Sequence, residues 1–355
     1  ALAYRAMPAK KAARHIWELH RRYRTNRLMA MDLIMSLDHV QNLLPELARL
    51  RRRDDSDLRL FYETKSNLTR AQLESFSAAG VTEILAGIES MSTGTLRRMR
   101  KGVRAIQNVQ TLKWGLAFEI KVVWNYLYGF PGEDPGEYDK AVDALLSLTH
   151  LQPPASYAPV RPERFSPYRE SFADFGLKGV TPDPVYAFLY PRKRFDLNRL
   201  AYSFEFAPGA VLTTADRRVA RLRDAVRSWA EVWPRNFFAS RRGVESVELF
   251  DSRPLGGGGG ECREHTLTGL EAAIYRRCET IATLGEVVKA CSERDPAVAP
   301  EEVRRILDEM TGRRWLWRED NFYLALAVPV SGLPPVQRHR LEMFQLASQQ
   351  AFSFS

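Results

Sequence analysis

Polar side chains that could do chemistry stand at the ends of strand-like stretches in this chain. In the run Tyr62-Glu63-Thr64-Lys65, the acid and the base are two residues apart, so both point to the same side of an extended segment. A second run is Gly87-Ile88-Glu89-Ser90. Its glycine permits a close approach to the backbone, while the carboxylate and the hydroxyl can hydrogen-bond ribose or ammonium groups.

A third polar run begins at Trp124-Asn125 and ends at Gly129-Phe130-Pro131-Gly132-Glu133. Its apolar strand breaks at Gly129 and Pro131, which predicts a rigid bend able to pack on a flat adenine. In a parallel barrel the carboxyl ends of the strands share one face, and that face carries the active site. Each run also has a plainer interpretation, because Glu–Lys pairs are commonly structural and Gly-Phe-Pro-Gly is a turn in most proteins.

The elements that must position these runs alternate between strand and helix about every 25–35 residues, which predicts right-handed βαβ units and a parallel sheet. A capping box, Thr69 with Gln72, begins one of the helices, and Gly80 should end it. Five such units without an initial strand predict an α/β fold, a (β/α) barrel lacking its first strand. The expected strands are 27–31, 58–62, 83–87, 120–128 and 156–160; the expected helices are 8–23, 37–50, 69–79, 103–116 and 135–148.

The rest of the chain has a different character. Residues 167–238 are dense in aromatics, which either pack a core or line a wall of a substrate cleft, and 214–233 should be an amphipathic helix. From 243 onward, two strands flank a flexible turn with five glycines, and three helices and a hairpin follow, which describes a winged helix. The predicted domains are 1–168 (partial barrel), 169–242 (aromatic-rich α+β extension on the substrate side), 243–330 (winged-helix-like) and 331–355 (tail).

Composition narrows the class of protein. The chain has 355 residues, 45% of them apolar, without an apolar run long enough for a membrane span and without a signal-peptide pattern. Three widely spaced cysteines argue against a disulfide framework and predict a cytoplasmic location. The net charge of +9 can steer nucleic acid, anionic peptides or phosphates, although a solvated basic surface is the favoured explanation.

The order and spacing of these runs resemble the radical S-adenosylmethionine (SAM) superfamily. More closely, the chain is similar to the cobalamin-dependent radical SAM C-methyltransferases that mature ribosomally synthesised peptides. The matching motifs include the three runs above and extend over nearly the whole chain. They continue with Ala3-Tyr4-Arg5, Met99-x-Lys101-Gly102-Val103, Gln107-Asn108, Arg164-Phe165-Ser166-Pro167-Tyr168, Leu189-Tyr190-Pro191, Thr266-Leu267-Thr268-Gly269-Leu270-Glu271 and Tyr323-Leu324-Ala325-Leu326-Ala327.

The resemblance implies cofactors and roles. Such enzymes hold a 4Fe–4S cluster on a CxxxCxxC loop, take an electron from an external donor, generate a 5′-deoxyadenosyl radical from SAM and deliver the methyl group from methylcobalamin. By matching position, the cofactor-binding residues would be Arg5, Glu63, Lys65, Gly87, Glu89, Ser90, Asn125, Gly129, Phe130 and Pro131. Gly87, Glu89 and Ser90 would contact the ribose or the methionine part of SAM. The 129–131 bend would bound the adenine, and Arg5 would face the SAM carboxylate or the cluster.

The chain also departs from the family pattern. Cys262, Cys278 and Cys291 lie in the winged-helix region, so we interpret them as buried or surface thiols on helices and assign no metal ligand. Leu33 stands where an Asn is expected after an acid. We expect the cluster cysteines and the cobalamin domain to precede Ala1, so that this chain is the downstream part of a longer enzyme and is inactive alone.

The predicted winged helix has several possible roles. A DNA-binding version would place helix 300–310 in the major groove, with Arg304, Arg305, Arg313 and Arg314 reaching bases or phosphates. A peptide-docking version would add a leader peptide to the β-ribbon as an extra strand. Next to this barrel we favour peptide docking, although a purely structural cap explains the domain as well.

The hypothesis from sequence is therefore a cytoplasmic radical SAM enzyme that modifies a ribosomal precursor peptide by C-methylation, using SAM, a 4Fe–4S cluster and cobalamin. No membrane partner is expected, and nucleic acid is not the favoured partner. The alternatives are a radical SAM enzyme acting on RNA, which the basic charge would suit, and a non-catalytic, cluster-less binding protein.

Overall fold

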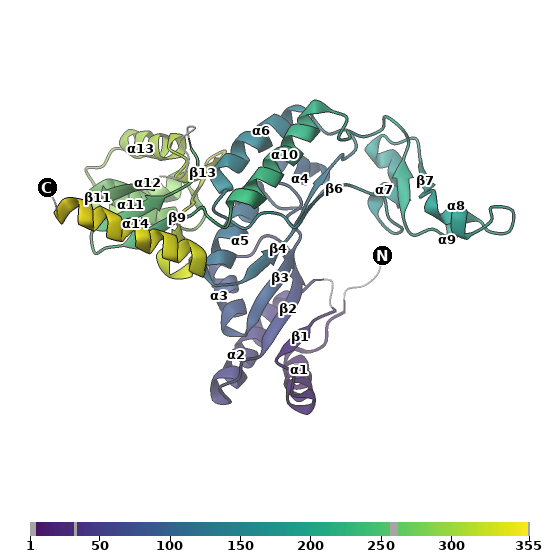
Figure 1. Cartoon of the computed structure of the whole chain (residues 1–355), viewed down its shortest axis with the longest axis horizontal. Coiled ribbons are helices and arrows are strands. Elements are labelled where there is room, and N and C mark those ends of the chain that lie inside the picture. The colour runs from purple at the N-terminus through teal and green to yellow at the C-terminus, as the bar shows by residue number, and fades with distance from the viewer. Residues whose placement is uncertain (1–4, 32–33, 256–261, 354–355) are drawn as a thin grey trace.

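The computed structural model describes residues 5–31, 34–255 and 262–353, and its centre is a parallel sheet (Figure 1). The four strands of this sheet, each pairing in parallel with the next, are β1 (Arg27–Met29), β2 (Arg59–Thr64), β3 (Val81–Ala86) and β4 (Lys121–Val123). Two further strands, β5 (Asn125–Tyr128) and β6 (Ser156–Pro159), form a separate parallel pair. The α/β class and the parallel sheet predicted from the strand–helix alternation are confirmed.

The prediction of a single strand over 120–128 is wrong, because the extended segment is interrupted at Trp124 and forms two strands, β4 and β5. The side chain of Gln152 binds alongside β4: its Oε1 accepts from the Val122 amide at 2.7 Å, and its Nε2 donates to Ile120 O at 3.0 Å. A side-chain amide thus takes backbone hydrogen bonds that a neighbouring strand would otherwise make. The isolated parallel bridge between Glu89 and Tyr126 connects the chain after β3 to β5. The closed barrel stays a prediction.

Helices lie along one face of the sheet, where alternate β2 side chains Leu60, Tyr62 and Thr64 are buried. They are α1 (Ala9–Tyr23), the π-helix η1 (His39–Leu43) with α2 (Leu44–Arg53), α3 (Arg70–Ala78) and α5 (Ala105–Ala117). The predicted capping box of α3 forms, with the Gln72 amide on Thr69 Oγ1 and the Thr69 amide on Gln72 Oε1. Gly80 has φ +87°, the left-handed conformation that ends this helix.

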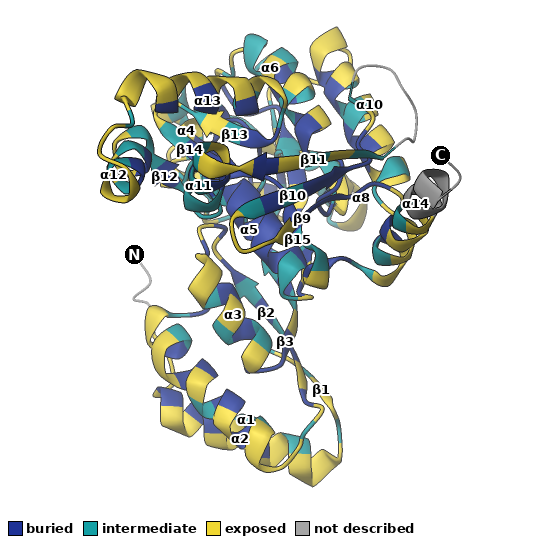
Figure 2. Cartoon of the chain, turned by 90° about the vertical axis from the view of Figure 1, so that its left-hand side faces the viewer, coloured by how far each residue is buried: buried dark blue, intermediate teal, exposed yellow. Residues whose placement is uncertain are grey.

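Helix α5 is buried on all sides, because the sheet covers one side and the C-terminal part of the chain covers the other (Figure 2). Even its polar residues Asn108, Thr111 and Lys113 are at most 1% exposed. The Lys113 ammonium donates to Ala325 O at 2.7 Å and to Glu279 O at 3.0 Å. A helix that is enclosed in this way joins two regions of the molecule into one packed core.

The remaining elements of the first half surround the strand ends. A short helix, α4 (Thr93–Arg98), follows the Gly87–Ser90 run and was not predicted. Helix α6 (Gly136–Leu145) and the 3-10 helix η2 (Leu146–Leu148) follow β5, and the predicted amphipathic helix is α10 (Arg217–Val232), which packs on α6. The α10 indole of Trp229 donates to Leu151 O at 2.9 Å, so this helix is tied to the chain beyond η2.

Between β6 and α10 the chain forms a lobe that protrudes from the molecule (Figure 1). We call residues 161–206 the aromatic lobe. Its antiparallel pair is β7 (Val180–Pro182) with β8 (Phe204–Phe206). Its short helices are α7 (Pro167–Glu170), η3 (Phe172–Phe175), α8 (Val185–Leu189) and α9 (Leu197–Leu200).

The described residues of the C-terminal part form two sheets and four helices. One sheet has the order β11-β10-β9-β15 and the other the order β12-β14-β13. The strands are β9 (Phe238–Arg242), β10 (Ser246–Asp251), β11 (Arg263–Thr268), β12 (Ala282–Thr283), β13 (Leu316–Glu319), β14 (Phe322–Ala325) and β15 (Val328–Pro329). The helices are α11 (Gly269–Arg277), α12 (Leu284–Arg294), α13 (Pro300–Gly312) and, after the 3-10 turn η4 (Val330–Gly332), α14 (Pro335–Ser353). Among the described residues, no helix has the length and apolar content that crossing a bilayer requires.

The predicted domain boundaries fall within connected structure. The 168/169 boundary lies in α7, and the 330/331 boundary lies in η4. The 242/243 boundary separates β9 from β10, which pair antiparallel over five residue pairs and therefore belong to one sheet.

The flexible turn predicted from residue 251 is wrong for its first part; Gly256–Gly260 lie outside the described residues. Asp251, Ser252 and Arg253 are at most 3% exposed. Arg253 binds Asp251 with two hydrogen bonds of 2.9 and 2.8 Å and donates to Ser147 O and Arg314 O at 2.8 and 2.9 Å. Burial alone would raise the pKa of Asp251, but the Arg253 guanidinium lowers it below the usual value. This buried pair ties η2 to the chain after α13.

Candidate functional site

The carboxyl ends of β2 and β3 bring four of the predicted site residues together. Glu63 lies opposite Leu85, and the Gly87 amide donates to Thr64 O at 3.1 Å. Lys65, directly after β2, and Gly87, directly after β3, therefore lie side by side. Strand side chains alternate between the faces of a sheet. Because Thr64 is buried against the helices, Glu63 and Lys65 lie on the opposite face, where Glu63 is half-buried and Lys65 is exposed.

Glu89 completes this group with an unusual backbone. Its φ is +59°, a left-handed conformation that is uncommon outside glycine and that clusters at functional sites. Its carbonyl accepts from the Leu127 amide at 2.9 Å, which fixes the residue between β3 and β5. The Glu89 carboxylate pairs with Lys101 at 2.8 Å, and both side chains are about a quarter exposed (27% and 28%).

Gly87 leaves room for that ion pair. A Cβ atom on Gly87 would lie 2.9 Å from Lys101 Nζ, so the end of the lysine side chain would have to shift. We name Glu63, Lys65, Gly87, Glu89 and Lys101 the strand-end cluster. Lys101 belongs to the Met99-x-Lys101-Gly102-Val103 motif, but the sequence did not indicate that Glu89 is its partner.

Two other predicted residues lie apart from this cluster. Asn125 begins β5 and is exposed, with its Oδ1 accepting from Ser156 Oγ at 2.7 Å. Arg5 is exposed, and no hydrogen bond or ion pair joins it to the described residues. Ala3 and Tyr4 of its motif, and Leu33, lie outside the described residues.

Ser90 faces the interior. It is 1% exposed, and its Oγ accepts from the Ser92 amide at 3.0 Å. The Asn108 side chain donates to Ser90 O at 2.9 Å and to Ile88 O at 3.1 Å, so α5 holds this run from behind. The Ser90 hydroxyl thus organises the backbone within the core.

The Gly129–Pro131 bend is buried as well. Gly129 has φ +77°, and a Cβ there would lie 2.6 Å from Leu212 O, so both the conformation and the space require glycine. Phe130 is 2% exposed and lies beside Tyr168 of the aromatic lobe, with ring centroids 6.2 Å apart. The predicted rigid bend is present, and the predicted contact with adenine stays a prediction.

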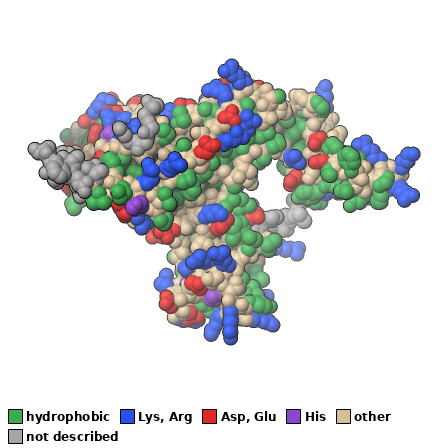
Figure 3. Space-filling model, in the orientation of Figure 1, with side chains coloured by type: hydrophobic (Ala, Val, Ile, Leu, Met, Phe, Trp, Pro, Cys, Tyr) green, Lys and Arg blue, Asp and Glu red, His purple; other side chains and the backbone are tan. Residues whose placement is uncertain are grey.

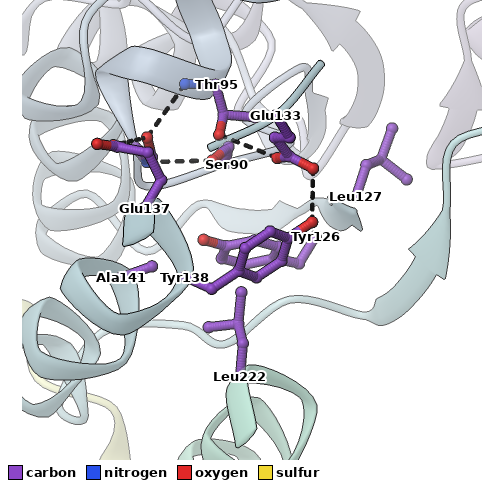
Figure 4. Close-up of a pocket in the computed structure, with 10 residues that line it drawn as sticks. Ser90, Thr95, Tyr126, Leu127, Glu133, Glu137, Tyr138, Ala141 and Leu222 are labelled. Carbon is purple, nitrogen blue, oxygen red and sulfur yellow. Dashed lines mark hydrogen bonds between the residues drawn. The ribbon is translucent and has the colours of Figure 1, made fainter. Parts of the chain in front are cut away.

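Glu133 holds this bend in place (Figure 4). Its Oε2 accepts from the amides of Gly129 (3.1 Å) and Phe130 (3.0 Å) and from the Tyr138 hydroxyl (2.5 Å). Its Oε1 accepts from Thr95 Oγ1 at 3.1 Å. Burial raises the pKa of Glu133, although these hydrogen bonds oppose the rise. Burial likewise raises the pKa of Tyr138, with the Glu133 charge adding to the effect.

The same close-up shows a second carboxylate, Glu137, which lies in α6, whereas Glu133 precedes this helix (Figure 4). It accepts from Ser92 Oγ at 2.6 Å and pairs with Lys140 at 2.8 Å. The cavity between these side chains has a volume of about 10 Å³, which is room for one water molecule at most. The hydrogen bonds of Glu133 and Glu137 therefore support the strand ends, and sequence reasoning did not single out this network.

The aromatic lobe exposes part of its apolar content. Exposed apolar side chains gather there beside basic residues (Figure 3): Phe165, Val185, Phe188, Leu189, Phe195 and Tyr202 are all at least 42% exposed. The consecutive Arg192, Lys193 and Arg194 are exposed, and no ion pair joins them to the described residues. Neither of the two predicted roles of these aromatics accounts for all of them, because Phe204 is fully buried whereas Phe188 is 88% exposed.

Three of the four arginines of the DNA-binding alternative have acidic partners, and Arg304 is exposed. Arg305 and Arg313 both pair with Glu309, and Arg314 pairs with Asp143. Helix α13 also carries Glu301, Glu302 and Asp308 on its exposed side. This mixed surface offers no continuous basic face for a phosphate backbone.

The cysteines do not form a metal site. Among the described residues, His, Cys, Asp and Glu side chains nowhere gather in groups of three or more that could hold a metal ion. Cys278 ends α11 and Cys291 lies in α12, as expected for thiols on helices, whereas Cys262 precedes β11. Burial raises the pKa of Cys278 and of Cys262 to about 12, so both stay protonated thiols and are poor metal ligands.

No protein-family model matches this chain, and no curated protein matches it. The solved structures similar to it include TsrM from Kitasatospora setae, a radical SAM methyltransferase with cobalamin and a 4Fe–4S cluster bound. TsrM is 17% identical, over 61% of this chain and 46% of that chain, with a TM-score of 0.47. OxsB, a cobalamin-dependent SAM radical enzyme, is 12% identical, over 88% of this chain and 42% of that one, with a TM-score of 0.36.

Elp3 of the archaeon Methanocaldococcus infernus is 8% identical, over 89% of this chain and 94% of that one, with a TM-score of 0.31. The chain thus spans less than half of the length of the TsrM and OxsB structures. TsrM and OxsB are radical SAM enzymes, and the sequence motifs of this chain resemble that superfamily.

Proposed function

We propose that the strand-end cluster binds SAM, and that this chain is the SAM-binding part of a cobalamin-dependent radical SAM enzyme that C-methylates a ribosomal precursor peptide. The observation that carries the proposal is the meeting of Glu63, Lys65, Gly87 and Glu89 at one edge of a parallel sheet. Ligands of open α/β sheets bind at this edge. The motif resemblance supports the choice of SAM and of a peptide substrate.

The chemistry of the cluster fits SAM. The ligand carries an ammonium group, a carboxylate and two ribose hydroxyls, which suit the carboxylates of Glu63 and Glu89 and the ammonium of Lys65. Lys101 balances Glu89 in the free protein, so the carboxylate is held in place before the ligand arrives. For the 4Fe–4S cluster, the described residues supply no matching ligand set, so no step of the reaction is derived through it.

The contribution of this chain is therefore binding and orientation. Glu89 and Glu63 would hold the polar part of SAM, while Gly87 allows its approach to the backbone. The bend at Gly129, which Glu133 fixes, directly follows β5, and β5 is hydrogen-bonded to Glu89. The bend would limit the movement of the adenosine. A preorganised site of this kind reduces the entropy lost on binding.

Two surfaces support a peptide substrate. The aromatic lobe combines exposed apolar side chains with three unpaired basic residues, a composition suited to an acidic peptide with apolar side chains. The segment from α11 to β14 has the helix and strand order of a winged helix, and the sheet order β12-β14-β13 makes β13 its longer edge strand. We propose that the precursor peptide adds to this edge.

Calorimetric titration of the full chain with SAM tests the binding site. The wild-type protein should bind SAM, and Glu89→Gln should weaken the affinity by about tenfold, or 1.4 kcal/mol. The matched control is Glu83→Gln, because Glu83 lies within β3, before the strand-end cluster, and pairs with Lys121 at 3.2 Å. Absence of binding to the wild-type chain, or equal losses in both variants, would contradict the proposal.

Fluorescence anisotropy with a labelled leader peptide encoded beside the gene tests the partner. Trp317→Ala in β13 should weaken peptide binding, whereas Val244→Ala, in the exposed turn between β9 and β10, should not. Thermal unfolding of both variants checks that they are folded. Tighter binding of an RNA oligonucleotide than of the peptide, with a steep salt dependence, would favour the RNA-modifying alternative.

A further inference from the structure

One carboxylate of the C-terminal part reaches the loops around the strand ends. Glu319, the last residue of β13, has a side chain that is only 13% exposed. Its Oε1 accepts from Thr93 Oγ1 at 2.6 Å and from Arg104 Nε at 3.0 Å, and its Oε2 accepts from the Ile106 amide at 2.9 Å. The acceptor and its donors are separated by more than 200 residues of chain.

These donors stand at the two ends of one excursion of the chain. Thr93 begins α4, while Arg104 and Ile106 flank the first residue of α5. Thr93 Oγ1 also accepts from the Ala105 amide at 2.8 Å, so the two ends are bound to each other as well as to Glu319. Residues 93–106 therefore form a loop that is closed at its base by one partly buried carboxylate.

The tip of this excursion carries Lys101, the partner of Glu89 in the strand-end cluster. Arg100 and Gly102 on either side have φ of +54° and +70°, so a tight turn presents the lysine. A partly exposed Lys–Glu pair by itself gains little, because ordering two long side chains costs entropy. Fixing the base of the loop lowers that cost, since fewer conformations of the loop remain to be lost.

We propose that Glu319 is a positioning residue for the SAM site: it closes the 93–106 excursion so that Lys101 meets Glu89. The inference rests on the proposed function and deepens it. Because the carboxylate belongs to the segment proposed to dock the peptide, docking and SAM binding are coupled through this loop. Such coupling is reciprocal, so a ligand at either place changes the affinity at the other.

The neighbouring contacts agree with this role. Asp320 also pairs with Arg104, but its side chain is 73% exposed, so it contributes less to the closure. The Arg104 guanidinium lies 5.0 Å from the Phe322 ring centroid, which holds it on the β13–β14 hairpin. Ser92, next to Thr93, donates to Glu137, so the base of the loop continues into the Glu133–Glu137 network.

The first experiment measures amide hydrogen exchange over 93–106 in the full chain without ligand. Glu319→Ala should raise exchange in this segment by about tenfold, because its base opens. Glu319→Gln keeps the volume and one acceptor oxygen, and it should fall between the wild type and Glu319→Ala. The control is Glu309→Ala, which removes a carboxylate paired with Arg305 and Arg313 on the exposed side of α13. Unchanged exchange in both Glu319 variants would overturn the proposal.

The second experiment is a double-mutant cycle on SAM affinity with Lys101→Met. Glu319→Ala should weaken SAM binding by about fivefold in the wild-type background but by less than about twofold when Lys101 is already absent. Equal losses in the two backgrounds would show a general structural effect and refute positioning through Lys101. If the wild-type chain binds no SAM, the proposed function fails, and the exchange result alone decides whether Glu319 closes the loop.

Discussion

Removing the Glu133 carboxylate should destabilise the protein by about 3 kcal/mol, because this one side chain accepts four hydrogen bonds beside the Gly129 bend. In Glu133→Ala the Gly129 amide keeps the Tyr138 hydroxyl as an acceptor at 3.0 Å. The Phe130 amide, the Tyr138 hydroxyl and the Thr95 hydroxyl lose their acceptor, and all three residues are at most 3% exposed.

Three buried donors without an acceptor cost about 1–3 kcal/mol each. Part of this cost is recovered, because burial raises the pKa of Glu133 and so already opposes its charged form. A water molecule entering the enlarged cavity would recover more. The balance gives about 3 kcal/mol, a large share of the 5–15 kcal/mol typical of a folded domain.

Urea denaturation at pH 7, followed by tryptophan fluorescence, measures this loss. Glu137→Ala is the matched control, since Glu137 lines the same cavity but accepts only from Ser92 within the core and pairs with the exposed Lys140. It should cost about 1 kcal/mol. Glu133→Gln, which keeps an acceptor oxygen, should fall between the two. A Glu133→Ala variant as stable as Glu137→Ala would refute the idea that Glu133 holds the bend.

Three further predictions concern stability, each measured as the free energy of unfolding in urea. Arg253→Met should cost about 3–5 kcal/mol, because it leaves the Asp251 charge buried without a partner. Its control is Arg318→Met, which removes an exposed pair with Asp308 and should cost under about 1 kcal/mol. Similar losses in the two variants would contradict the burial argument. Burial lowers the pKa of Lys113 to about 7 in the folded protein. Between pH 7 and about pH 10 the unfolded chain therefore binds more protons than the folded one, and the free energy of unfolding rises with pH. Lys113→Met should lose this rise, and a pH profile equal to that of the wild type would contradict the lowered pKa. Gly332→Ala should cost about 1–3 kcal/mol, because its Cβ would lie 2.5 Å from the Ala117 Cα. Its control is Gly312→Ala, which has open space around it and should cost nothing. A Gly332→Ala variant as stable as the wild type would disprove the tight approach of the two backbones.

Local pattern was enough to predict most elements. The capping box at Thr69, the stop at Gly80 and the amphipathic helix α10 follow from interactions within a few residues, which the sequence displays directly. Strand–helix alternation likewise predicted the parallel sheet, and parallel strands bring their carboxyl ends to one edge. Glu63, Lys65, Gly87 and Glu89 could therefore be grouped before their positions were known.

What only the tertiary structure decided are contacts between distant parts of the chain. Gln152 hydrogen-bonds to the backbone beside β4, Arg253 forms a buried ion pair in a segment predicted to be flexible, and Glu319 reaches back to α4. No local periodicity marks such partners, because a polar side chain has the same sequence pattern whether its partner is water or a buried group far along the chain. Burial and pairing of charges depend on how the loops pack together, and that packing is a property of the whole fold.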